Sequence, residues 1–73
     1  MRITIESTTK TVTVDGVPAR IWEGHTESGI PVHCFVTRIA APIGGNLREF
    51  EQDLQEHRAP SADVQAYSLR LLL

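Results

Sequence analysis

A chain of 73 residues with one cysteine, a formal charge of −2 and a pI near 5.8 has room for a single domain, spanning residues 1–73. The lone cysteine excludes an intramolecular disulfide and is typical of a reducing compartment, so we expect a cytoplasmic protein. The acidic balance argues against nucleic-acid binding, and we expect neither a signal peptide nor membrane association, because no apolar run approaches the roughly 20 residues that span a bilayer.

The N-terminal part alternates between apolar and polar residues, which is typical of strands. We expect short strands over residues 2–6 and 11–14, joined by a polar connection. Asp15-Gly16 then predicts a tight hairpin, because a type I′ turn needs positive φ at both central residues. A third strand follows over residues 17–22.

The fourth predicted strand is the longest, from residue 30 to about residue 40, and it ends at a Pro-Ile-Gly-Gly break. The spacing of the apolar residues then changes, because Leu47, Phe50 and Leu54 follow one another at intervals of three and four residues. This spacing predicts an amphipathic helix from residue 47 to about residue 57.

The ends of the last two elements carry their own signals. Asn46 is a good N-cap for the helix. Glu49 lies at the position from which the acid of a capping box bonds to the backbone amide of the N-cap residue. Residues 65–73 alternate again, which predicts a final strand. A C-terminal helix is the alternative, since leucine and alanine are good helix formers.

The order of elements is therefore strand, strand, strand, strand, helix, strand. It predicts an α+β fold in which a twisted antiparallel sheet of four to five strands carries one amphipathic helix packed on one face.

Residues 22–35 contain many polar side chains. The register of their hairpin determines which of these side chains lie opposite one another. If the loop contains an even number of residues, the numbers of two residues that face each other across the hairpin add up to 55. Trp22 then lies beside His33 and Arg20 beside Phe35 on one face, with Cys34 packed in the core on the other.

If Gly29 instead forms a bulge after a type I turn, the sum becomes 56 and Glu23 faces His33. A slip of one residue exchanges the two faces of a strand. The first register gathers the apolar side chains of both strands on one face, so the hydrophobic pattern favours it.

The same stretch does not predict a metal or catalytic site. His33 and Cys34 are neighbours on a strand and point to opposite faces, so they cannot share one ion. Cys34 also lacks a helix N-terminus or an imidazolium that would stabilise its thiolate. We expect no cofactor, no metal and no enzymatic activity.

The first functional hypothesis is a non-enzymatic interaction module that binds a partner protein through an aromatic and basic sheet face. That face consists of Arg20, Trp22, His33 and Phe35. The alternative is a small-ligand binder that sequesters an anionic metabolite or nucleotide at a subunit interface, using Arg20, Arg38 and stacking on Trp22.

The chain ends in an apolar run that would be unfavourable in water. A domain of this size buries only roughly 60% of its unfolded surface, so self-association would add stability. We expect a homo-oligomer whose interface contains Tyr67, Leu69, Leu71 and Leu73.

The run ITIEST, followed by VDGVPARIWEGHTESGIPVHCFVTRIA, an acidic helix and the tail PSADVQAYSLRLLL, resembles small uncharacterised proteins encoded in bacteriophage and prophage genomes. The resemblance covers nearly the whole chain and rests on turns and strands rather than on chemical signatures. It implies a bacterial host cytoplasm and an accessory role, and it implies no catalytic or binding residues.

Overall fold

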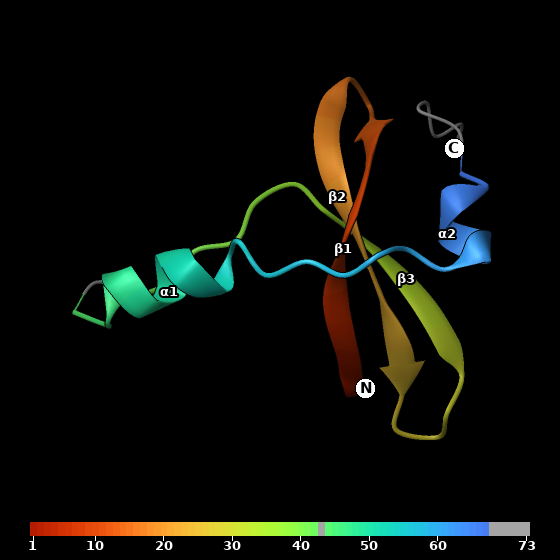
Figure 1. Cartoon of the computed structure of the whole chain (residues 1–73). Coiled ribbons are helices and arrows are strands. Elements are labelled where there is room, and N and C mark those ends of the chain that lie inside the picture. The colour runs from red at the N-terminus through yellow and green to blue at the C-terminus, as the bar shows by residue number, and fades with distance from the viewer. Residues whose placement is uncertain (43, 68–73) are drawn as a thin grey trace.

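The computed structural model describes residues 1–42 and 44–67. Along the chain, the elements are β1 (Ile3–Val14), β2 (Val17–Thr26), β3 (Pro31–Val36), α1 (Leu47–Asp53) and α2 (Ala62–Gln65) (Figure 1). The strands form one antiparallel sheet in the order β1-β2-β3. Within the described residues, the protein is thus a small α+β fold with a three-stranded sheet followed by two short helices, rather than the four to five strands that the sequence predicted.

β1 is one long strand where the sequence predicted two. Its pairing with β2 shifts between Ser7 and Thr11, so the polar run there is a bulge inside the strand and not a connection. Thr8 is fully buried in this bulge, and its hydroxyl donates a 2.7 Å hydrogen bond to the carbonyl of Ile21. This hydroxyl takes the place of the backbone donor that the bulge displaces, which allows the strand to continue.

The first hairpin turn confirms the prediction made for Asp15-Gly16. Both residues have positive φ, 50° at Asp15 and 79° at Gly16, as a type I′ turn requires. Val14 and Val17 pair directly across this turn.

The second hairpin has the bulged register, so the register that the hydrophobic pattern favoured is wrong. Gly29 has a φ of 87° and donates to the carbonyl of Thr26 at 2.9 Å, while the Thr26 amide donates to the Ile30 carbonyl at 2.9 Å. Glu23 therefore lies opposite His33. The left-handed glycine adds one residue to the loop and fixes the register. Apolar side chains occur on both faces of these strands, so the hydrophobic preference for the other register is weaker than the preference of the turn.

β3 is shorter than predicted because its partner strand contains a proline. The last pair of the ladder joins Arg20 to Val36. Hydrogen-bonded pairs alternate along an antiparallel ladder from Thr26 and Ile30, so the next one would need the amide of Pro18. Proline has no such donor, and the strand ends there instead of near Ala40.

The core lies on one face of the sheet, and α2 covers it. Val12, Ile21 and Val64 form the buried cluster. α2 is capped by Ser61, whose hydroxyl accepts from the Val64 amide at 3.4 Å. The predicted strand over residues 65–73 is wrong at its start, where Gln65 ends α2, because a helix of one turn is too short to show a period in the sequence. Residues 68–73 lie outside the described residues.

α1 does not provide the predicted cover for the sheet. Its N-cap is confirmed, since the Glu49 amide donates to the Asn46 side chain at 3.0 Å. However, α1 has no buried residue, and Leu47 is 55% exposed. In Figure 1 this helix projects away from the sheet. It ends at Asp53 rather than near residue 57, because the following segment pairs with β1.

Gly24 marks a close approach between two strands. A Cβ atom at this position would lie 1.7 Å from the backbone oxygen of Thr4 and 2.7 Å from the Cα of Ile5, which is its partner in β1. Only glycine fits here. In the part of the chain that the structure describes, no helix has the length and apolar character to cross a membrane.

Candidate functional site

The bulged register divides the predicted interaction face between the two sides of the sheet. Directly opposed residues share a face in an antiparallel pair. Trp22 pairs with Cys34, and Arg20 lies two residues away on the same side. His33 and Phe35 lie on the other side, so the four predicted residues do not form one surface. Cys34 is correspondingly not in the core but on the same face as Trp22, where it is half-buried.

His33 and Phe35 contact their own chain. Nδ1 of His33 lies 2.8 Å from the hydroxyl of Tyr67. The rings of Phe35 and Tyr67 pack edge to face with their centroids 5.4 Å apart. Tyr67, which the sequence assigned to an oligomer interface, therefore helps to cover the core face. Leu69, Leu71 and Leu73 of the same predicted interface lie outside the described residues.

The opposite face carries an open groove of about 250 Å³ between the sheet and the segment that follows α1. We call it the Trp22 groove. The lining residues that matter for its chemistry are Arg20, Trp22, Val36, Arg38, Leu54 and His57.

The arginines give one side of the Trp22 groove positive charge. Arg20 is held in place, because its Nη1 donates a 2.8 Å hydrogen bond to the carbonyl of Thr8 in the bulge. Its other N–H groups make no further hydrogen bond among the described residues and could donate to an acceptor in a ligand. Arg38 is exposed just beyond β3. Trp22 adds a half-buried aromatic surface to the same groove, which thus combines apolar area with two guanidinium groups.

A second hollow, of about 430 Å³, shares Trp22 and His57 with the groove. Its charged lining residues are three acids, Glu6, Asp53 and Glu56, and one base, Arg58, so acidic groups outnumber basic ones in this hollow. Trp22 and His57 lie at the boundary between the basic and the acidic hollow.

Ser7 and His57 form a close pair within the second hollow. The Ser7 hydroxyl lies 3.1 Å from Nδ1 of His57 and donates a 2.7 Å hydrogen bond to the Glu56 carbonyl. A hydroxyl has one proton, so the imidazole donates to Ser7 in this arrangement and does not accept from it. The contact therefore links residues 56–57 to β1, and His57 does not activate the Ser7 hydroxyl as a nucleophile.

Residues 56–61 cross β1 on their way from α1 to α2 (Figure 1). The Arg58 amide donates to the Ser7 carbonyl and the Thr9 amide donates to the Arg58 carbonyl, both at 3.1 Å. This segment thus adds one parallel bridge, between Thr8 and Arg58, at the position of the bulge.

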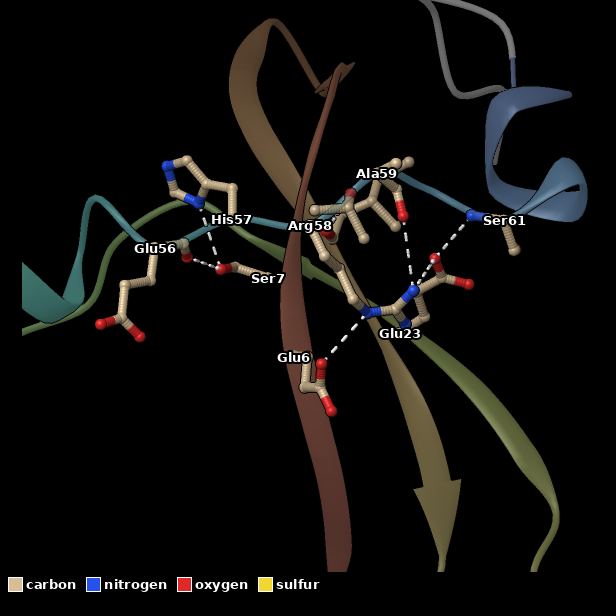
Figure 2. Close-up of polar contacts among 10 residues, drawn as sticks. Glu6, Ser7, Glu23, Glu56, His57, Arg58, Ala59 and Ser61 are labelled. Atoms are coloured by element: carbon tan, nitrogen blue, oxygen red, sulfur yellow. Dashed lines mark hydrogen bonds and ion pairs between the residues drawn. The ribbon is translucent and has the colours of Figure 1, made fainter.

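The side chain of Arg58 reaches the core face and joins two acids, as Figure 2 shows. Its Nε lies 3.2 Å from the carboxylate of Glu6, and its Nη1 lies 3.3 Å from that of Glu23. The same Glu23 oxygen accepts a 2.8 Å hydrogen bond from the Ser61 amide. We call these four residues, Glu6, Glu23, Arg58 and Ser61, the Glu23 clasp.

Glu23 is only 7% exposed, yet its pKa lies below the ordinary value. Hydrogen bonding from Ser61 lowers the pKa of Glu23 more than burial raises it, and the nearby Arg58 and His33 lower it further. The sequence did not predict this cluster, because its members are far apart in the chain. Of the groups near Glu23, only His33 could be expected from the sequence, because the bulged register places it opposite Glu23.

No three histidine, cysteine, aspartate or glutamate side chains among residues 1–42 and 44–67 are grouped as metal ligands. No family model matches the sequence, and neither a curated protein nor a solved structure matches the chain. The resemblance to phage-encoded proteins therefore stays a prediction.

Proposed function

We propose that the protein is a small non-enzymatic interaction module and that the Trp22 groove is its binding surface. The observation that carries this proposal is that Trp22 and two arginines, Arg20 and Arg38, line one open groove. Tryptophan and arginine are the residues most enriched where single side chains dominate a protein interface. This surface replaces the predicted one, because it keeps Arg20 and Trp22 and exchanges His33 and Phe35 for residues on the same face.

The size of the groove favours a partner protein over an enclosed small molecule. Small-molecule pockets are typically about 300–1,000 Å³ and enclose most of their ligand. An open groove of about 250 Å³ suits one anchoring side chain of a larger partner. The apolar surface of Trp22, Val36 and Leu54 would pack against a large apolar side chain. Arg20 and Arg38 would pair with a neighbouring carboxylate. We therefore propose an acidic partner segment that carries one large apolar residue.

The test compares partner capture by immobilised wild-type protein with capture by Trp22→Ala and Arg38→Glu. Both variants should lose the captured protein, because one removes the apolar contact and the other reverses the charge. Leu47→Ala is the matched control, since it removes an exposed apolar side chain from α1. Unchanged circular dichroism shows that each variant is folded. Equal capture by the folded variants and by the wild type would rule the proposal out.

The second candidate is a small anionic ligand with a flat apolar group, such as a nucleotide. It is favoured by one observation: Arg20, Trp22 and Arg38, which the sequence suggested for such a ligand, all line the same groove. Trp22 is the only tryptophan, so its fluorescence reports directly on the groove. A panel of nucleotides that changes neither this fluorescence nor the thermal stability counts against this candidate.

Self-association is a further part of the proposal, and β3 supports it. In the described part of the chain, β3 pairs with β2 alone. The backbone groups of His33 and Phe35 point away from β2 by the alternation of the ladder. Such an edge can pair with the same edge of a second copy. Light scattering tests this, and a monomer at high concentration would contradict it.

A further inference from the structure

One wall of the Trp22 groove does not belong to the sheet. Leu54 and His57 come from the chain that follows α1, whereas Trp22 and Val36 come from the strands. The groove therefore has its shape only while this chain lies against β1. α1 does not hold it there, because α1 has no buried residue.

The segment is held by the Ser7 hydroxyl, which contacts residues 56 and 57, and by Arg58 where it meets the sheet. Its backbone makes two hydrogen bonds with β1, and its side chain reaches Glu6 and Glu23. Glu6 is an exposed partner, with 72% of its side chain accessible, so solvent screens that ion pair. Glu23 is buried, and it also accepts the Ser61 amide, which makes it the stronger anchor.

His57 and Arg58 are consecutive residues, and they reach opposite faces of the sheet. His57 lines the groove beside Trp22, and Arg58 extends to Glu23 on the core face (Figure 2). Fixing the Arg58 side chain therefore also fixes the backbone that carries His57. This adjacency links a buried carboxylate on one face to the shape of the groove on the other.

We infer that Glu23 is a positioning residue for the Trp22 groove: through Arg58 and Ser61 it holds residues 54–58 in place as the groove wall, and its loss opens the groove. As a statement about binding, this inference rests on the proposed function. As a statement about the groove itself, it does not need a partner.

The test uses Glu23→Gln, which keeps the shape of the side chain and removes its charge. Losing the negative charge that strengthens the contacts of residue 23 with Arg58 and Ser61 should raise the population of the open segment roughly ten-fold. Acrylamide quenching of Trp22 fluorescence should then increase. Trypsin should also cut after Arg58 several-fold faster, while the rate of cutting after Arg48 in α1 stays the same.

Two controls separate positioning from general stability. Glu51→Gln removes the same charge from the exposed surface of α1 and should change neither readout. Val12→Ala weakens the core on the Glu23 face without touching the clasp, and it should leave Trp22 quenching unchanged in the folded protein. Increased quenching in Val12→Ala would show that loss of stability alone opens the groove, and the inference would be wrong.

Unchanged quenching and cutting in folded Glu23→Gln would also overturn the inference. If that variant loses the circular dichroism spectrum of the sheet, Arg58→Gln is tested by quenching alone, because the Arg58 side chain is 43% exposed and its replacement is milder than that of the buried Glu23. Increased quenching then supports the inference, and wild-type quenching contradicts it. None of these readouts involves a partner, so failure here is distinct from failure of the capture experiment with Trp22→Ala.

Discussion

The Glu23 carboxylate lies 3.3 Å from the Arg58 guanidinium, at the point where the chain crosses β1 between the two helices. The same carboxylate accepts the Ser61 amide, and the same guanidinium contacts Glu6. One buried acid thus joins β2 to the segment that precedes α2. Because this segment also carries His57, the contact connects the core face with the Trp22 groove on the other face.

The clasp makes stability depend on pH in the acid range. The pKa of Glu23 is lower in the folded protein than its usual value of 4.5, so its contribution is present above that pH. The contribution is lost as the pH falls through the folded pKa. The charged groups around Glu23 are Arg58 from the crossing segment, His33 from β3 and Glu6 from β1.

Urea unfolding at a series of pH values checks this prediction. The wild type should lose stability below about pH 4.5, and Glu23→Gln should lose less over the same range because it has no proton to bind. Glu51→Gln is the matched variant and should follow the wild type. If Glu23→Gln shows the full acid dependence of the wild type, another carboxylate is responsible.

Gly24→Ala should be strongly destabilising. The added Cβ would lie 1.7 Å from the Thr4 oxygen, which is backbone and cannot rotate away, so β1 must separate from β2. We expect a loss of roughly 2–4 kcal/mol in the free energy of unfolding, a large part of the stability of a small domain. Urea unfolding measures it.

Gly45→Ala is the control for this substitution, because its nearest contact is the Pro42 oxygen at 3.4 Å. It should change the stability by less than about 1 kcal/mol. Equal effects of the two substitutions would mean that β1 and β2 are not as close at Gly24 as described.

Short patterns in the sequence predicted local structure. The candidate site depends on contacts between residues that are far apart in the chain, and short patterns do not specify these contacts. Asp15-Gly16 and Asn46 predicted their turn and cap because each acts on its own neighbours. The sequence around Gly29 was compatible with two hairpin registers, and only the geometry of the turn distinguishes them. The Glu23 contact with Arg58 depends on where the crossing segment returns to the sheet, which no short pattern specifies.

Thr8→Val should test whether the bulge in β1 depends on one hydroxyl. Valine has the same shape but leaves the buried Ile21 carbonyl without the donor that Thr8 provides. We expect a loss of about 1–3 kcal/mol in urea unfolding. Thr9→Val, at the exposed neighbour, should cost less than about 0.5 kcal/mol. Similar effects of the two variants would show that the hydroxyl of Thr8 does not support the bulge.

The pairing of Trp22 with Cys34 gives a direct test of the register that defines the groove. A nitroxide attached to Cys34, the only cysteine, should strongly quench Trp22 fluorescence, because directly opposed side chains lie about 4.5–5.5 Å apart at Cβ. The matched variant combines Cys34→Ser with His33→Cys, which moves the label to the other face. It should quench much less, since the sheet then separates label and indole. Stronger quenching from position 33 would instead support the register in which Trp22 lies beside His33, and the Trp22 groove would lose its basis.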